Sequence, residues 1–380
     1  MFTPSLAVQR IAAQSQRPAT RPGPEVISLA TGDPDFATPA FIQRALIDAI
    51  ENGYTHYVEN QGDHELRQAI ASQLESVSGN AYSIDQVVVT HGASGALSAA
   101  ILATINPGDR VLLPEPTYSL YADLVQFAGG IPVYVRQTPG FHLDFDVLES
   151  EAANARMIVL CHPCNPTGVV YRRDELEALA ALAERHELLV LCDEAYDHII
   201  FDDTEFVSSL EVPELRDRLL YCQTFSKTYA MTGWRIGYLV APSAIAAAAA
   251  RIHRTFASAM NAAVQRAALA ALTTPNDFPE QMRREYQVRR EMVPEFLAGT
   301  PGITVNPTDG TFYSFIRYEQ EIPSTQVAAA AIEQGVAIRA GSEYGPGGEH
   351  HVRIAFSSER QQLTEGLLRL RTLFTTLANR

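Results

Sequence analysis

The spacing of apolar residues changes along the chain and predicts where strands and helices lie. Between residues 87 and 240, short apolar runs such as 188–192 alternate with longer segments such as 173–187, in which apolar residues recur every three or four positions. Runs of the first kind are typical of strands covered on both faces, and the longer segments are typical of helices. This alternation predicts a mainly parallel α/β sheet. The expected strands are 87–89, 110–113, 131–135, 157–160, 188–192, 219–223 and 237–240.

The pattern changes after Ala241. Two long helical patterns at 242–273 and 278–298 are followed by short strands with helices between and after them, which predicts a separate α+β unit. Pro275 and Pro279 mark the junction. The short strands are expected at 303–305, 312–316, 336–339 and 352–356. Other expected elements are helices at 6–14, 41–52, 65–75, 94–105 and 118–127 and a strand at 27–30.

Size and composition limit the classes of protein that this chain can belong to. At roughly 150 residues per domain, 380 residues suggest two domains, and 46% hydrophobic with 19% charged residues are typical of a globular protein. The net charge of −15 argues against nucleic acid or an anionic membrane as a partner. No run approaches about 18 uninterrupted apolar residues, and residues 1–21 lack the apolar block of a signal peptide. We expect a cytoplasmic protein.

The four cysteines do not suggest a disulfide framework. Cys161 and Cys164 form a C-x-x-C motif, which raises the possibility of a metal or redox site. No second cysteine pair has zinc-ligand spacing. The sequence therefore favours two small apolar side chains at the end of a buried strand, and no metal is expected.

Lys227 is the only lysine among the 29 basic residues. It follows an apolar strand and has Phe225, Tyr229, Met231 and Trp234 as neighbours in the sequence. Such surroundings disfavour an ammonium and lower the pKa of a lysine, as a Schiff-base amine requires. Any chemistry that needs an amine side chain in this protein has one candidate.

Two other segments carry candidate chemistry at the ends of expected strands. Asp193 follows the apolar run 188–192, and Asn165 comes after the strand 157–160, so both would lie where open α/β sheets bind ligands. Asp and Asn at such positions are also common helix caps and turn formers. The small residues of 91–97 could admit a phosphate at the start of a helix, although they match neither a dinucleotide-binding fingerprint nor a Walker loop.

Taken in order, these segments resemble the class I/II aminotransferases, fold-type I enzymes that use pyridoxal 5′-phosphate and are similar to aspartate aminotransferase. The resemblance covers nearly the whole chain. It rests on Thr31-Gly32-Asp33-Pro34, Tyr57 with Gly62 and Glu65-Leu66-Arg67, Asn165-Pro166-Thr167-Gly168, Asp193-Glu194-Ala195-Tyr196, Ser226-Lys227 with Gly233-x-Arg235-x-Gly237, Gly310-Thr311-Phe312-Tyr313, and Arg353-Ile354-Ala355-Phe356.

The resemblance implies a fold and an activity. We expect a large cofactor-binding domain with a seven-stranded, mostly parallel sheet at residues 46–275, and a small α+β domain from both chain ends, at 1–45 and 276–380. The activity would be ping-pong transfer of an amino group between an L-amino acid and a 2-oxo acid, with glutamate and 2-oxoglutarate as one pair. At least a homodimer with shared active sites is expected.

The resemblance also implies catalytic and ring-binding residues. Lys227 would form the Schiff base with the cofactor and then act as general base and acid. Asp193 would pair with the pyridinium nitrogen and keep the ring an electron sink. Asn165 and Tyr196 would hydrogen-bond the 3-oxygen of the ring, and Tyr118 would stack on its face.

The remaining implied contacts hold the phosphate and the substrate. Phosphate ligands would be Ala93, Ser94, Thr224, Arg235 and, from the partner subunit, Tyr57. Thr224 stands where the family usually has Ser or Gly, which leaves the phosphate geometry open. Arg353 would bind the substrate α-carboxylate bidentately, with help from Asn165 and the backbone of Gly32.

Two other functions and the substrate stay open at this level. A C–S β-lyase uses the same constellation, and a pyridoxal-phosphate-binding regulatory domain is a non-enzymatic alternative. No helix-turn-helix pattern precedes the fold, and the acidic charge disfavours the regulatory alternative. A side-chain carboxylate of the substrate could be bound by any of four arginines, namely Arg17, Arg21, Arg136 and Arg339.

Overall fold

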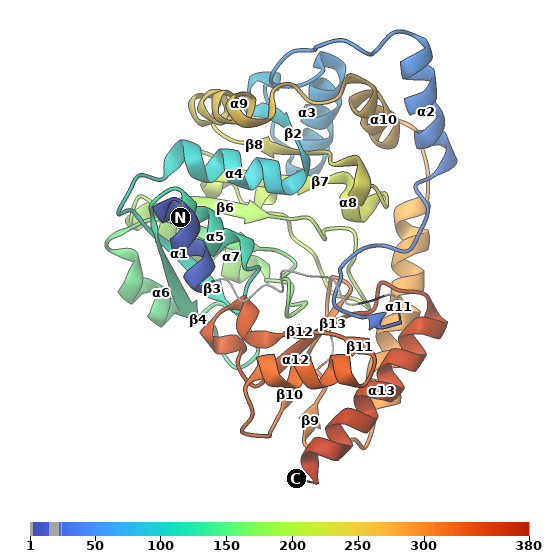
Figure 1. Ribbon diagram of the computed structural model, residues 1–380. Helices are drawn as coiled ribbons and strands as arrows, with labels where there is room; N and C mark the ends of the chain where they lie inside the picture. Colours follow the sequence, from blue (N-terminus) through green and yellow to red (C-terminus); the bar gives the residue numbers. More distant parts are fainter. Residues whose placement is uncertain (1–2, 15–22, 24, 307, 380) are drawn as a thin grey trace.

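The computed structural model describes residues 3–14, 23, 25–306 and 308–379 (Figure 1). Arg17 and Arg21, two of the candidate substrate-binding arginines, lie outside these residues. Within the described part of the chain, no helix is long and apolar enough to cross a membrane.

A seven-stranded sheet forms the larger part of the molecule, as the alternating pattern predicts. Its strands follow the spatial order β2-β8-β7-β6-β5-β3-β4, and all neighbours are parallel except β8, which is antiparallel to β2 and β7. The strands are β2 (Val87–Thr90), β3 (Arg110–Glu115), β4 (Ile131–Arg136), β5 (Ala155–Cys161), β6 (Leu189–Asp193), β7 (Leu219–Thr224) and β8 (Gly237–Val240).

Helices cover both faces of this sheet. Successive residues of a strand point to opposite faces, so Val87 and Val89 lie in one hydrophobic core and Val88 lies in another. One face is covered by α4 (Gly92–Thr104), α5 (Leu120–Phe127) and α9 (Ser243–Ala257). The other is covered by α2 (Ala40–Glu51), α3 (His64–Ser78), α6 (Phe145–Ala152), α7 (Arg173–Arg185) and α10 (Ala262–Thr273). Burial of both faces explains why the central strands lack polar alternation.

The C-terminal elements form an α+β unit with a third hydrophobic core. In Figure 1 most of these orange and red elements lie below the sheet, and α11 lies to its right. A four-stranded antiparallel sheet contains β12 (Arg339–Ala340), β13 (His351–Ala355), β10 (Tyr313–Tyr318) and β9 (Ile303–Thr304). Beside it, β1 (Ile27–Ser28) pairs in parallel with β11 (Val336–Ala337). The helices of this unit are α11 (Phe278–Leu297), α12 (Ser324–Glu333) and α13 (Arg360–Ala378).

Two predicted elements are wrong. The expected helix 242–273 is two helices, because Ser258 has a positive φ of 60° and Asn261 begins α10 by accepting a hydrogen bond from the Val264 N–H at 3.0 Å. The expected strand 336–339 is divided between β11 and β12, which belong to different sheets. The spacing of apolar residues reveals neither break, because both result from the conformation of the backbone.

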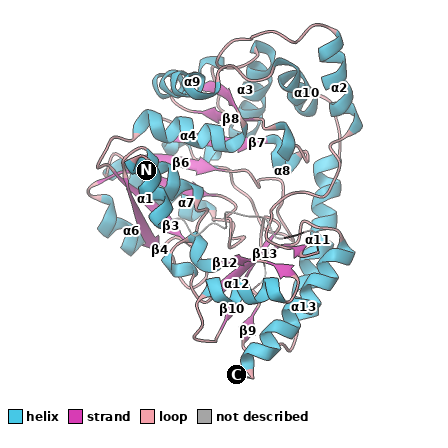
Figure 2. Cartoon of the chain, viewed as in Figure 1, coloured by secondary structure: helices cyan, strands magenta, loops and turns pink. Residues whose placement is uncertain are grey.

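The structure also contains short elements that the pattern does not predict. These are the helices α6 and α8 (Phe225–Thr228), and the 3₁₀ turns Ile84–Gln86, Ser209–Glu211, Pro213–Leu215, Thr232–Trp234, Gly341–Tyr344 and Pro346–Gly348. Figure 2 shows that loops occupy much of the space between the large sheet and the C-terminal unit.

The N-terminal segment contacts both parts of the molecule. Helix α1 (Leu6–Gln14) packs against α5, and α2 packs against α10, whereas β1 joins β11 in the C-terminal unit. The division into domains at residues 45 and 275 stays a prediction.

Candidate functional site

A cavity of ≈ 300 Å³ opens where the carboxyl ends of β5, β6 and β7 face the C-terminal unit. This is the edge at which open α/β sheets bind ligands. The predicted site residues that line it are Gly32, Ala93, Ser94, Tyr118, Asn165, Asp193, Tyr196, Thr224, Lys227, Arg235 and Arg353. Residues from seven separate parts of the sequence therefore meet in one cavity.

Lys227 lies on the short helix α8, immediately after β7. The Thr224 hydroxyl accepts a hydrogen bond from the Ser226 N–H at 3.2 Å and begins the helix. The Lys227 Nζ donates to the Gly32 carbonyl at 2.6 Å. Burial, helped by repulsion from the nearby cations Arg235 and Arg353, lowers the pKa of this amine to about 8 against the opposing effect of Asp33. At pH 7 about a tenth of the amine is thus neutral and nucleophilic.

Asp193 is the last residue of β6, and its carboxylate is buried beside the cavity. One carboxylate oxygen accepts from the Tyr121 hydroxyl at 2.9 Å, and the other accepts from the Ala195 N–H at 3.3 Å. Burial raises the pKa of Asp193 to about 6, although these hydrogen bonds and the Lys227 charge oppose the increase. A buried carboxylate favours a cationic partner, and a protonated ring nitrogen in the cavity would provide one.

Arg353 is a buried cation that no carboxylate of the described residues pairs with. Its Nη1 donates to the Asn165 Oδ1 at 3.0 Å, its Nη2 donates to the Ala30 carbonyl, and its guanidinium lies 4.1 Å from the centre of the Tyr313 ring. The Nε has no partner among the described residues. These neutral partners hold the guanidinium in place without neutralising it, so the site fits an anion.

The start of α4 and Arg235 form a second place for an anion. Arg235 is in the left-handed region with φ 54°, and this backbone brings its side chain against Gly92. A Cβ at Gly92 would lie 2.8 Å from Arg235 Nη2, and one at Gly237 would lie 2.9 Å from the Ala93 nitrogen. The two glycines therefore keep free backbone N–H groups and a guanidinium close together, as a phosphate requires.

The site also contains residues that the sequence analysis did not predict. The Tyr313 hydroxyl lies 3.0 Å from the Tyr196 hydroxyl, and Tyr121 holds Asp193 as described above. Ser226 and Tyr313 also line the cavity. Tyr121 could have been found from its position one helical turn after Tyr118. Tyr313 and Ser226 belong to motifs that carry the family resemblance, but the sequence alone assigns no role to either residue.

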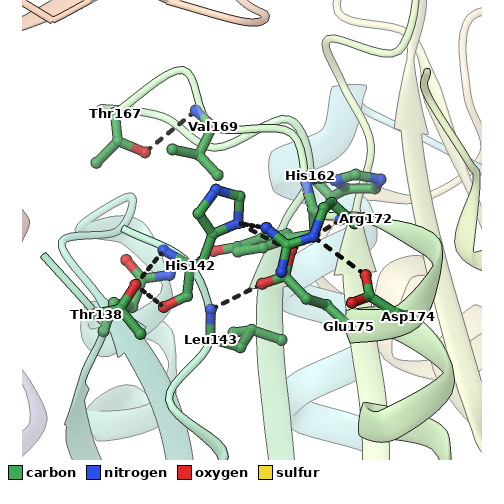
Figure 3. A network of polar contacts seen from close by, with 11 residues as sticks. Thr138, His142, Leu143, His162, Thr167, Val169, Arg172, Asp174 and Glu175 are labelled. Carbon is green, nitrogen blue, oxygen red and sulfur yellow. Dashed lines mark hydrogen bonds and ion pairs between the residues drawn. The ribbon is translucent and has the colours of Figure 1, made fainter. Parts of the chain in front are cut away.

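A polar network fixes the loop that carries Asn165 (Figure 3). The buried Glu175 at the start of α7 accepts from His142 Nδ1 at 2.9 Å, from the Leu143 N–H at 3.0 Å and from the Arg172 N–H at 2.9 Å. Burial alone would raise the pKa of Glu175, but these bonds outweigh it and hold the pKa below its usual value. His162 spans the same loop, because it accepts from the Tyr171 N–H at 3.3 Å and contacts the Val207 carbonyl at 2.9 Å.

Some predicted residues lie elsewhere. Tyr57, which we expect to reach the phosphate of the partner subunit, is 92% exposed and does not line the cavity of its own chain. Arg136 ends β4 on the surface, whereas Arg339 lines the cavity. Cys161 lines the cavity floor and is a free thiol like Cys164. Among the described residues, no three His, Cys, Asp or Glu side chains are grouped to hold a metal ion.

The lowered pKa of Lys227 can be measured directly because the chain has no other lysine. In protein without added ligand, we expect a small amine-reactive reagent to label the Lys227 peptide increasingly as the pH rises, with a midpoint near pH 8. Mass spectrometry of that peptide measures the labelled fraction. A midpoint near 10.5 would contradict the desolvated amine. Arg235→Gln should move the midpoint upward, because it removes one repelling cation.

The raised pKa of Asp193 predicts a cost to folding. Unfolded chains lose this proton near pH 3.8, whereas the folded protein keeps it until about pH 6, so stability falls across that window and stays reduced above it. Asp193→Asn should therefore raise the free energy of unfolding at pH 8, without added ligand, by up to about 3 kcal/mol. The gain should vanish near pH 4. Urea denaturation at pH 8 and at pH 4 measures the two free energies of unfolding, with Glu177→Gln on the exposed side of α7 as the control. If Asp193→Asn and the unaltered protein had the same free energy of unfolding at pH 8, the assignment of Asp193 as a buried, ionised carboxylate would be wrong.

Comparison with known proteins agrees with this geometry. Residues 24–370 match the family described as Aminotransferase class I and II. The aspartate/prephenate aminotransferase of Cereibacter sphaeroides is 35% identical over 373 residues, which cover 94% of this chain and 93% of that protein. The arginine–pyruvate transaminase AruH of Pseudomonas aeruginosa is 36% identical over 353 residues, which cover 92% of this chain and 90% of that protein.

Solved structures give the same result. The aromatic aminotransferase of Pyrococcus horikoshii OT3 has a TM-score of 0.90 and 33% identity to this chain, and the match covers 96% of this chain and 98% of that one. The family match spans most of the sequence and the similarity extends through both parts of the fold. This chain therefore belongs to the class I and II aminotransferases and is a pyridoxal-phosphate-dependent aminotransferase.

Proposed function

We propose that the enzyme transfers an amino group between an L-amino acid and a 2-oxo acid at the cavity that contains Lys227, with glutamate and 2-oxoglutarate as one pair. The relatives named above act on different amino acids according to their names, so the proposal rests on the site. The observation that carries it is the buried Arg353, which no carboxylate of the described residues neutralises and which shares one cavity with Lys227. A guanidinium so placed suits the α-carboxylate that all these substrates share.

The residues present fit pyridoxal phosphate. Arg235 and the backbone N–H groups of Ala93 and Ser94 would hold its phosphate, with the Thr224 hydroxyl beside them. Asp193 would pair with the ring nitrogen. Tyr118 would stack on the ring, and Asn165 and Tyr196 would hydrogen-bond its 3-oxygen; all three line the same cavity. When bound, the cofactor supplies an electron-accepting ring that stabilises negative charge at the substrate α-carbon.

The chain contributes charge balance and proton transfer. Lys227 has a pKa of about 8, so its Nζ can take a proton from the substrate α-carbon near neutral pH and later return one. Asp193, held by Tyr121, would stay ionised beside a cation because pairing lowers a carboxyl pKa. Arg353, fixed by Asn165, orients the substrate so that the α-carbon faces Lys227.

We also propose a homodimer in which Tyr57 reaches the phosphate of the partner subunit. Within one chain Tyr57 is 92% exposed, and Tyr54, Ile47 and Ile50 near it are also exposed. Exposed apolar side chains gathered in one segment are typical of an interface. Sedimentation measurements would test the dimer.

Lys227→Ala tests the central assignment. The variant should still bind pyridoxal phosphate non-covalently, whereas borohydride should attach the cofactor to the Lys227 peptide of the unaltered protein only. We expect transamination to fall by at least about 10³-fold, because the amine that moves the proton is gone. A half-reaction screen of amino acids, followed by cofactor absorbance, measures the loss. Full activity of this variant would refute the mechanism, and pyruvate release from a cysteine conjugate without an oxo acid would point to a C–S β-lyase instead.

Arg353→Lys tests the α-carboxylate assignment. An ammonium cannot reproduce the two parallel bonds of a guanidinium, so kcat/KM should fall about 10- to 100-fold for aspartate, alanine and phenylalanine alike. Binding of pyridoxal phosphate should be unchanged. A loss confined to one substrate would contradict the assignment.

A further inference from the structure

A second cavity, of ≈ 260 Å³, lies beside the short helix α8, on the side away from the cavity that contains Lys227. Ser226 and Lys227 line the substrate cavity, whereas Phe225 and Thr228 line the second cavity. At 3.6 residues per turn, these two pairs fall on opposite sides of a helix. A single helix therefore separates the two cavities, and the proposed reaction uses only one of them.

Aromatic rings form much of the wall of the second cavity. Five aromatic side chains line it, namely Phe206, Tyr221, Phe225, Tyr229 and Tyr238. The centre of the Phe225 ring lies 6.1 Å from the centres of both the Tyr229 and the Tyr238 rings. The face of an aromatic ring carries partial negative charge and attracts cations, and clustered rings are typical of sites that recognise quaternary ammonium groups.

Acidic side chains outnumber basic ones in the same wall. Glu194, Asp197 and Glu211 line the second cavity, and His198 is the only basic side chain among the described residues that do so. Glu211 lies 3.6 Å from the Arg173 Nη2, and the Asp197 Oδ1 lies 2.7 Å from the His198 Nδ1. Burial raises the pKa of Glu194 to about 7, so about half of this carboxyl is ionised at neutral pH and adds further negative charge.

The substrate cavity has the opposite character. Its lining contains one acidic side chain, Asp193, and four basic ones, which are Lys227, Arg235, Arg339 and Arg353. Because like charges repel in a partly desolvated site, a cation is disfavoured there and an anion is favoured. A cationic ligand therefore discriminates between the two cavities.

We propose that the second cavity binds a small organic cation with apolar substituents, such as a quaternary ammonium, with its charge against the aromatic rings and Asp197. Leu74, Val77 and Leu272 complete the lining with apolar surface. A small inorganic cation would lose its water to this surface without replacement, which is unfavourable. The methyl groups of a quaternary ammonium would instead bury apolar area against it. The inference is independent of which amino acid the enzyme transaminates.

Choline and 3,3-dimethylbutan-1-ol test the inference, because they have the same shape and only choline is charged. Choline has no primary amine and cannot form a Schiff base with the cofactor. Calorimetry on the cofactor-loaded protein should show that choline binds at least about tenfold more tightly than the alcohol, since only the cation is attracted by the rings and the carboxylates. Equal affinities, or no binding at about 10 mM choline, would overturn the inference.

Variants then locate the bound cation. Asp197→Asn keeps the size of the side chain and removes its charge, so it should raise the Kd of choline about 3- to 10-fold and leave that of the alcohol unchanged. Tyr229→Leu should raise the Kd of choline about threefold, because one ring face is lost. Absorbance of the bound cofactor reports that each variant is folded.

Asp203→Asn is the matched control. Asp203 is exposed, lies six residues after Asp197 and does not line the second cavity, so its substitution should leave the Kd of choline unchanged. A Kd for choline that Asp197→Asn does not change, or that Asp203→Asn changes equally, would mean that choline binds elsewhere and would overturn the inference. Transamination by the unaltered protein is measured separately, so its absence would refute the proposed function and leave the cation site standing.

Discussion

The site depends on burying charged groups that do not pair with one another. Asp193, Lys227 and Arg353 line one cavity, yet no ion pair within 4 Å in the described part of the chain joins any of them. Burial acts on each in the expected direction, raising the pKa of Asp193 to about 6 and lowering that of Lys227 to about 8. Neutral side chains bond to two of these charged groups instead: the Tyr121 hydroxyl donates to Asp193, and Arg353 donates to the Asn165 Oδ1. The folded protein therefore keeps charges poised for a ligand at a cost in stability.

The architecture supplies this arrangement from two directions. The parallel sheet, covered on both faces, brings the ends of β5, β6 and β7 to one edge, where Asp193 and Lys227 lie. The antiparallel sheet of the C-terminal unit brings Arg353 and Arg339 to the opposite wall. The amine of Lys227 and the guanidinium of Arg353 therefore come from different parts of the fold and meet at the cavity between them.

The glycines at the phosphate end show how small residues permit close approach. Gly237 leaves no room for a Cβ, since the Gln223 carbonyl oxygen would lie 2.5 Å and the Ala93 nitrogen 2.9 Å from it, whereas Gly92 has a positive φ of 68° and a Cβ there would press on the Arg235 guanidinium. Arg235 itself takes a left-handed backbone that few residues with a side chain adopt. Such a backbone is strained in isolation and persists because the surrounding contacts impose it.

Apolar periodicity and motif order determined the sheet, the family and most cavity residues. A buried strand requires an uninterrupted apolar run, so the seven strands could be predicted from local sequence, and the single lysine identified the only possible Schiff-base amine. The break at Ser258 and the division of 336–339 between two sheets could not be predicted, because they depend on backbone conformation and on which strands meet in space. The contacts of Tyr121 with Asp193 and of Arg353 with Asn165 likewise need tertiary structure. Sequence order gives the chemistry that a residue can perform, but only packing decides which residue faces the cavity.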